Sequence, residues 1–467
     1  MASIYRERGS MERDGSARVA RWSSHRVFVI AAIGATIGLG NVWRFPQLVA
    51  EHGGSAFILV YVLALLLLGL PLLIAEMVLA RRTCGALPAT FPAEVRAAQA
   101  AAGWRLLPWL TLVAAWLVLA VLVVIGSWLL AYLTTAISGG FAGISAHGVA
   151  LRFDALVRSP EVGIGWLTLF LGGTVVVSAL GVRRGLERAA TLGLALVAGC
   201  WGLGLLLLLS AGQLGAGLAW SFTFDPGALG VDGLLAALAQ AFFTLTLGAG
   251  AMHAYTVHLP PGGALPGFAA RVILGDTALA LLVTVLVLSL LASSGQDAVA
   301  GPVLLFAALP AALGGLSNGG WLAVVLYASF AVVTWLTALA LFEPLVLALA
   351  AKRRCNRLCA ALMTGVSLWL AGLLLVSSFA FTPGGRWVGH GPFGWFEFVG
   401  GRVLIPLSAL LLALFIGWVL PERERRTVLA LVPVAQYRAW RMLLRYAVPP
   451  LLLLVFLAGA DILRSPL

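Results

Sequence analysis

The chain has 467 residues, of which 61% are hydrophobic and only 10% are charged, and its mean hydropathy is +1.02. These values exclude a soluble globular protein and are typical of a membrane protein with many spans. The net charge of +12 does not indicate nucleic-acid binding, because the basic residues fall in short loops between apolar stretches. The four cysteines are too few and too scattered for a disulfide framework.

Residues 1–26 contain six arginines and no apolar region followed by a cleavage site, so we expect a cytoplasmic tail. Apolar stretches long enough to cross about 30 Å of hydrocarbon follow along the rest of the chain. We predict eleven spans, at about 27–50, 56–80, 108–137, 163–181, 189–211, 233–257, 269–293, 321–350, 357–380, 398–420 and 447–463.

The loops between these spans differ in charge. Most of the 30 lysines and arginines fall on the side of residues 1–26 when the spans alternate across the membrane. Because basic loops stay in the cytoplasm, this bias places the N-terminus inside. An odd number of spans then places the C-terminus outside.

The first span contains a break. Residues 31–53 read AAIGATIGLGNVWRFPQLVAEHG, with Gly34, Gly38 and Gly40 close together and Pro46 soon after. An unwound backbone inside a membrane survives only where it lines a cavity in the protein, and its free carbonyls and amides can then hold ions. We therefore predict a broken helix with a binding site at the break.

A second break is predicted at residues 241–255, AFFTLTLGAGAMHAY. The two breaks lie in spans one and six, which predicts inverted repeats at about 27–211 and 233–420 within one transporter domain, 27–463, followed by an extra helix at 447–463. The alternative for each glycine-rich segment is a packing face between helices.

The motifs resemble one family. Trp22, then GATIGLGNVWRFPQLVAEHGGSAFILVY and GLPLLIAEMVLAR, are similar to the opening of bacterial neurotransmitter:sodium symporters, and further matches extend to about residue 463. The resemblance implies an all-α integral membrane protein with the leucine-transporter fold, located in a bacterial inner membrane. It also implies sodium as the coupling ion, with no other cofactor.

The resemblance also assigns roles to residues of this chain. It implies two sodium sites, formed by Gly34, Thr36, Ile37, Asn41, Thr244 and Thr337. It implies a substrate site formed by Thr36, Leu39, Gly40, Val118, Leu122, Phe243, Thr246, Gly248 and Ala249. Arg44 and Glu397 resemble an outer gate that pairs when substrate binds. Oxygen ligands of these kinds suit a hard cation.

Several positions depart from the family pattern. Leu122 replaces a substrate-contacting tyrosine, Leu336 replaces a polar sodium ligand, and Ala351 replaces an acid of the inner gate. An asparagine of the first sodium site aligns near Gly267, and the fourth position of an anion site, otherwise matched by Tyr61, Gln240 and Thr244, aligns with Arg271. These departures put sodium stoichiometry and substrate recognition in question more than the fold.

Four other ionisable residues lie within spans. We interpret Glu76 and Glu343 as structural acids that bond to broken-helix backbone, and His253 as a core histidine with satisfied hydrogen bonds. Asp276 is expected to pair with Arg271.

Two hypotheses for function remain. The first is a sodium-coupled symporter that imports a small neutral, apolar amino acid or related amine by alternating access. The second is a membrane protein derived from the same family that binds ligand without transport or without sodium. An intramembrane enzyme is disfavoured, because the sequence contains no nucleophile motif, paired catalytic acids or metal-ligand spacing. The expected partners are a small-molecule substrate and the lipid bilayer, while the oligomeric state stays open.

Overall fold

The computed structural model describes residues 20–295, 301–316, 318–353, 355–380 and 391–459. Within these ranges every regular element is a helix, and one isolated bridge joins Gly54 to Phe224. The predicted all-α fold is therefore confirmed. Residues 1–19 of the predicted tail and the last predicted residues of the extra helix lie outside these ranges.

The helices follow one another with short connections. Their bounds are α2 His25–Thr36, α3 Phe45–Glu51, α4 Ser55–Ala64, α5 Leu70–Thr83, α6 Leu87–Ala97, α7 Leu107–Ile137, α8 Ala146–Val157, α9 Pro160–Ala179, α10 Glu187–Ser210, α11 Leu214–Phe222, α12 Gly230–Phe243, α13 Ala251–Val257, α14 Leu265–Ser294, α15 Leu309–Gly314, α16 Gly319–Arg353, α17 Arg357–Ala380, α18 Pro392–Glu397, α19 Ile405–Leu414, α20 Glu422–Val428, α21 Val434–Met442 and α22 Val448–Gly459.

Nine continuous helices of the described residues are long and apolar enough to cross a membrane, and α2 with the helix at Gly40–Glu51 forms a tenth, bent span. The sixth predicted span is divided between α12 and α13. Each of these is too short to cross about 30 Å alone at 1.5 Å per residue. The last helix, α22, begins at Val448, next to the predicted residue 447. The helical stretch that contains it starts earlier, at Val434, because a basic, amphipathic segment continues into the apolar span.

Local sequence explains where the key helices begin and end. The Ser24 side chain caps α2 by accepting a hydrogen bond from the Val27 amide. Pro46 stands at the start of α3, directly after the π-helical turn Gly40–Arg44, so the helix here continues past a residue that has no amide to donate. Gly250 precedes α13 with φ +74°, a left-handed conformation that glycine adopts without strain.

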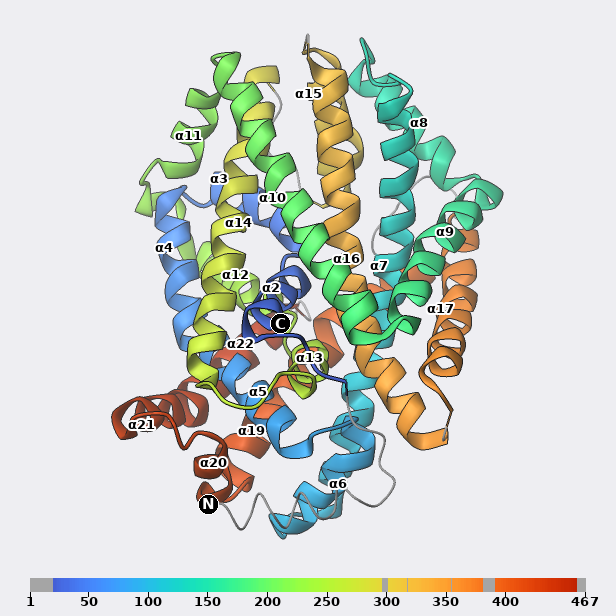
Figure 1. The fold of residues 1–467 in the computed structure, drawn as a ribbon. Helices are drawn as coiled ribbons and strands as arrows, with labels where there is room; N and C mark the ends of the chain where they lie inside the picture. Colours follow the sequence, from blue (N-terminus) through green and yellow to red (C-terminus); the bar gives the residue numbers. More distant parts are fainter. Residues whose placement is uncertain (1–19, 296–300, 317, 354, 381–390, 460–467) are drawn as a thin grey trace, which may run out of the picture.

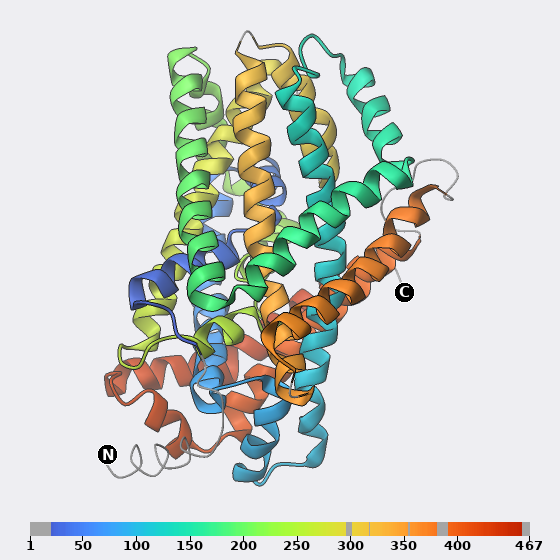
Figure 2. The same cartoon turned by 45° about the vertical axis from the view of Figure 1, so that its right-hand side comes forward.

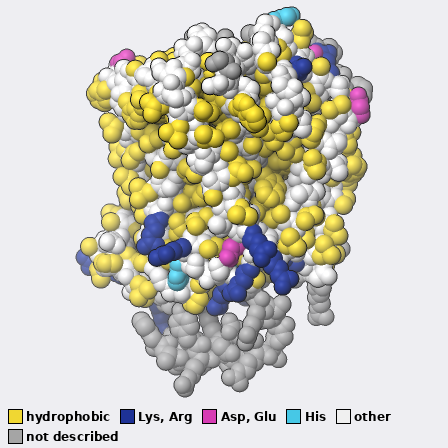
Figure 3. Space-filling model, turned by 45° about the horizontal axis from the view of Figure 1, so that its top comes forward, with side chains coloured by type: hydrophobic (Ala, Val, Ile, Leu, Met, Phe, Trp, Pro, Cys, Tyr) yellow, Lys and Arg dark blue, Asp and Glu magenta, His cyan; other side chains and the backbone are white. Residues whose placement is uncertain are grey.

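The long helices α7 and α16 form the centre of the molecule, and they are the spans with the largest buried share. Figure 1 shows them at the middle of the bundle, with α8, α11 and α15 at one end and α6, α20 and α21 at the other. Helices α9 and α17 lie side by side and tilted at the edge (Figure 2). Apolar side chains cover much of the face in Figure 3, while lysines and arginines gather toward one end.

Candidate functional site

The predicted break in the first span is present. Helix α2 ends at Thr36, and a second helical segment, Gly40–Glu51, continues at an angle of 61°. Ile37 has an extended conformation with ψ 95°, so its carbonyl leaves the helical hydrogen-bond ladder. The break therefore supplies backbone oxygen atoms inside the bundle.

The second break lies between α12 and α13, at residues 244–250. Thr246, Gly248 and Gly250 all have positive φ, of 52°, 79° and 74°. A Cβ atom on Gly248 would lie 2.6 Å from the Ile405 carbonyl oxygen, so only glycine fits there without a shift. The segment is thus a break and not a packing face of a continuous helix. The Thr246 hydroxyl donates to the Ala35 carbonyl at 3.2 Å and so joins the two breaks.

Three buried polar side chains meet beside the breaks. The Asn41 Nδ2 donates to Asp276 Oδ1 at 3.0 Å, and the Thr244 Oγ1 lies 2.7 Å from Asn41 Oδ1 and 2.8 Å from Asp276 Oδ2. With Asp276 ionised, the Thr244 hydroxyl has one proton for two acceptors, so one acceptor is left without it. A cluster with more oxygen lone pairs than protons is suited to a cation. We refer to Asn41, Thr244 and Asp276 as the oxygen cluster.

Asp276 is the residue that sequence reasoning misassigned. The expected pair with Arg271 is replaced by bonds from Asp276 to Asn41 and Thr244, and the Arg271 guanidinium lies 5.6 Å from the centre of the Phe268 ring. Gly267 lies in the first turn of α14, more than two turns before Asp276, and no hydrogen bond within the described residues joins it to the polar side chains at the breaks. An acid inside an apolar span was the available signal, since such residues mark ion sites by default.

Two side chains surround the cluster and belong to the predicted anion site. The Gln240 Nε2 donates to Asn41 Oδ1 at 3.4 Å. The Tyr61 hydroxyl is buried without a hydrogen-bonding partner among the described residues. The Thr36 hydroxyl, at the end of α2, donates to the Ile33 carbonyl at 3.0 Å.

The structure brings together two of the residues predicted for the second sodium site, Thr337 and Ile37. Thr337 Oγ1 in α16 lies 3.2 Å from the Ile37 carbonyl oxygen at the first break. Leu336 packs against Gly34, where an added Cβ would meet its Cδ1 at 3.3 Å. One hydroxyl and one backbone oxygen therefore meet, with an apolar side chain at the position of the missing polar ligand.

The predicted substrate residues lie on α7 and around both breaks. Phe243 ends α12 and packs on Phe242 with ring centroids 5.0 Å apart. Val118 and Leu122 lie one turn apart on α7, and Val118 faces Gly400, where an added Cβ would meet its Cγ2 at 3.2 Å. Ala249 is fully buried. Leu39 and Gly40 start the second half of the first span.

The two residues of the predicted outer gate have other contacts. Glu397 accepts from Arg402 at 3.2 Å, and the Arg44 guanidinium lies 5.8 Å from the centre of the Phe243 ring. Within the described ranges no ion pair joins Arg44 to Glu397, so their pairing stays a prediction for another state of the gate.

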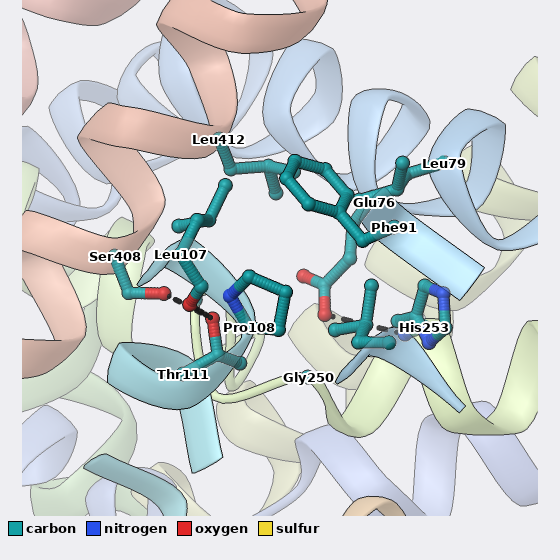
Figure 4. A pocket seen from close by; sticks show the side chains of 12 residues that line it. Glu76, Leu79, Phe91, Leu107, Pro108, Thr111, Gly250, His253, Ser408 and Leu412 are labelled. Carbon is teal, nitrogen blue, oxygen red and sulfur yellow. Dashed lines mark hydrogen bonds between the residues drawn. The ribbon is translucent and has the colours of Figure 1, made fainter. Parts of the chain in front are cut away.

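The Glu76 carboxylate accepts a hydrogen bond from the backbone of α13, directly after the second break. Its Oε1 accepts from the His253 backbone amide at 3.2 Å, in the first turn of α13. Figure 4 shows this carboxylate at a small cavity, opposite Thr111 and Ser408, whose hydroxyls lie 2.6 Å apart. The His253 Nε2 lies 2.8 Å from the Thr83 hydroxyl. Glu76 Oε2 is buried without a hydrogen-bonding partner among the described residues, so only one of its oxygens has the predicted contact with backbone.

The sequence and the fold are similar to those of known proteins. The model of the sodium:neurotransmitter symporter family matches residues 19–143. An uncharacterized sodium-dependent transporter of Bacillus subtilis, YhdH, is 31% identical over 94% of this chain and 97% of its own length. An uncharacterized sodium-dependent transporter of Haemophilus influenzae is 26% identical over the same shares. The crystal structure of MhsT in complex with L-phenylalanine aligns with a TM-score of 0.82 and 30% identity, covering 94% of this chain and 99% of that one.

Proposed function

Since the chain belongs to the sodium:neurotransmitter symporter family, and is a sodium-dependent membrane transporter rather than an enzyme, we propose that it imports a neutral, apolar amino acid by alternating access. The observation that carries the proposal is the oxygen cluster of Asn41, Thr244 and Asp276 between the two breaks. Ligand and coupling ion would then share the unwound segments at the centre of the bundle.

In this proposal the oxygen cluster holds the first sodium ion. Asp276 brings a formal negative charge, and Asn41 and Thr244 add neutral oxygens, a set that suits a hard cation. Thr337 and the Ile37 carbonyl would contribute to a second site, together with the Gly34 backbone.

The substrate's two ends would meet the broken backbone. Amides at Leu39 and Gly40, at the start of a helical segment, favour a carboxylate, and carbonyls freed at the breaks favour an ammonium group. Leu122 and Ala249 offer only apolar surface to the side chain. Such surface gains about 25 cal/mol per Å² from apolar contact and offers nothing to a charged side chain. The bound L-phenylalanine of MhsT supports this class of ligand.

We also propose the orientation in a bacterial inner membrane. The positively charged end of the molecule, visible in Figure 3, would face the cytoplasm, because basic residues concentrate on that side. The start of α2 would then lie inside and the end of α22 outside.

Uptake by the purified protein in proteoliposomes tests the function. We expect labelled L-phenylalanine or L-leucine to accumulate under an inward sodium gradient and not under an equal potassium gradient. Equal accumulation in both would contradict sodium coupling. Sodium-dependent binding with no accumulation would instead support the second hypothesis, a ligand-binding protein that does not transport.

A further inference from the structure

A groove lies between α7, α8 and the start of α9, at the end of the molecule that carries α11 and α15 (Figure 1). Its volume is about 400 Å³, which falls within the range of small-molecule sites in proteins. The Phe153 ring of α8 lies edge-on to Trp128 of α7 with centroids 5.5 Å apart, so these two walls are packed together. We refer to this space as the α7–α9 groove. Its polar lining comes from Thr134, Thr135, Ser138, Arg152 and Ser159.

The hydroxyl groups of the α7–α9 groove can only accept hydrogen bonds from a ligand. Thr134 and Thr135 both donate to the Ala131 carbonyl, at 2.8 and 3.0 Å. Ser138 and Ser159 donate to carbonyls three and four residues earlier in the chain, at 2.9 and 2.8 Å. A hydroxyl has one proton, and each of these protons is already used. The hydroxyl oxygens therefore offer lone pairs to the groove and no donor.

The Arg152 guanidinium supplies the donors. Its Nη1 donates to the Gly140 carbonyl, while its Nε and Nη2 have no hydrogen-bonding partner among the described residues. Arg152 is the only charged side chain among the described residues that line the groove. The acid nearest to it in the chain, Asp154, is paired with Arg158 at 2.7 Å. The positive charge of Arg152 is therefore available to a ligand.

A ligand that matches both halves of this lining carries an anionic group and N–H donors. A guanidinium binds phosphate through parallel hydrogen bonds. A primary ammonium group has three donors and no acceptor, so it matches oxygens that offer only lone pairs. The complementary chemistry is thus a zwitterion that joins an anionic oxygen group to an ammonium group, as in phosphoethanolamine.

The apolar lining places such a ligand at the membrane surface. The apolar span that contains α9 begins at Pro160, and Val162 and Trp166, in its first two turns, line the groove. Tryptophan is typical of the boundary between headgroups and hydrocarbon. The outward face of the same helix stays apolar, since Val162 and Leu169 are 45% and 59% exposed. An acyl chain attached to a headgroup in the groove would lie along this face.

We propose that the α7–α9 groove binds the headgroup of a phospholipid that carries a primary ammonium group. The phosphate accepts hydrogen bonds from Arg152, and the ammonium group donates to the hydroxyl oxygens of Thr135 and Ser138. The acyl chains follow the exposed apolar face of α9. The lining contains no residue of either break, so this site goes beyond the proposed transport function and its test requires neither sodium nor an amino acid.

Native mass spectrometry of the purified full chain tests the proposal, because it resolves protein with no lipid from protein with one lipid bound. We would titrate phosphatidylethanolamine and phosphatidylcholine with identical acyl chains. Neither has a net charge, but the quaternary nitrogen of phosphatidylcholine has no N–H group. We expect phosphatidylethanolamine to bind about three- to tenfold more tightly, since charge-assisted hydrogen bonds at an exposed site contribute modestly.

Two variants test the two halves of the site. Thr135→Val with Ser138→Ala should make the two lipids bind equally, and Ser138→Ala alone should reduce the preference if the double variant fails to fold. Ser210→Ala is the control, because Ser210 also donates to a carbonyl three residues earlier but does not line the groove.

Arg152→Gln should weaken the binding of both lipids about three- to tenfold, because both carry the phosphate. Arg158→Gln removes the same charge from a residue of the same loop region that does not line the groove, and it should bind both lipids as the wild type does.

Equal binding of the two lipids by the wild type would overturn the proposal, as would a preference that persists in the Thr135→Val, Ser138→Ala variant. Equal lipid affinity in Arg152→Gln and Arg158→Gln would exclude the phosphate contact and overturn it as well. Displacement of the lipid by an equal concentration of free phosphoethanolamine would assign the groove to a soluble ligand and overturn the lipid site. Failure of the uptake experiment changes none of these outcomes.

Discussion

Asp276→Asn removes a formal charge from the oxygen cluster while keeping the side-chain shape. The new amide oxygen can still accept from Asn41 Nδ2, and the new amide nitrogen can donate to the Thr244 oxygen, so both observed contacts have a counterpart. We therefore expect the variant to fold and to insert in the membrane. The substitution should weaken the binding of the cation, because it removes the negative charge that faces it.

The magnitude follows from burial. Asp276 and Asn41 are 0% and 1% exposed, so little water screens the interaction of the carboxylate with a sodium ion. Interactions with a charged group contribute about 1.5–3 kcal/mol. Because 1.4 kcal/mol corresponds to a factor of ten, we expect sodium to bind about ten- to a hundredfold more weakly.

Sodium titration of purified protein with radiolabelled sodium measures this effect directly. Glu76→Gln is the control, since it neutralises another buried acid whose Oε1 contact with His253 an amide oxygen can replace. Sodium affinity should fall in Asp276→Asn and stay near the wild-type value in Glu76→Gln. Equal sodium affinity in Asp276→Asn and the wild type would refute the assignment of the first sodium site.

Three further predictions concern the second site, the gate and the substrate. Thr337→Val should weaken sodium binding about fivefold, because it removes one neutral oxygen ligand worth about 1 kcal/mol. Thr334→Val is the control and should leave sodium binding unchanged, because the Thr334 hydroxyl bonds within α16. Equal sodium affinity in the two variants would contradict the second site. Charge reversal at both Arg44 and Glu397 should recover uptake that either single reversal abolishes, and a double variant no better than the worse single one would exclude their pairing. In competition binding, L-phenylalanine and L-leucine should displace bound label better than glycine, glutamate or lysine, and tightest binding of any of those three would exclude the apolar pocket.

The fold was predictable because the bilayer restricts the choices. Long apolar stretches of this kind form helices, and grouped glycines inside such a stretch form either a packing face between helices or a break that faces protein. Both predicted breaks are present at Ile37 and at Thr246–Gly250. The predicted start of the last helix lies next to Val448, where α22 begins, but the helical segment from Val434 that precedes it was not predicted, since its basic sequence reads as a loop.

The site was predictable only where both partners lie in the matched motifs. Asn41 and Thr244 were assigned together and do meet. Asp276 was not, because a glycine- and proline-rich loop of uncertain length precedes α14 and shifts any alignment by whole helical turns. The contact of Asp276 with Asn41 joins residues 235 positions apart, and no local pattern reports such a distance.

Helix α2 connects the break in the first span with residues 20–23, which contact α13. Near its end, the Ala35 carbonyl accepts from Thr246 and the Ile37 carbonyl accepts from Thr337, at the break proposed to hold the ion and substrate. Residues 20–23, which precede α2, contact the end of α13 through the Trp22 side chain. A helix of 12 residues is about 18 Å long and stiff, so its two ends cannot move independently. Under the proposed sodium site, loss of the ion at the break would loosen the contact of residues 20–23 with α13, and release of these residues would in turn disturb the carbonyls at the break. Cation binding proposed at the break and docking of residues 20–23 would therefore be coupled through one rigid element.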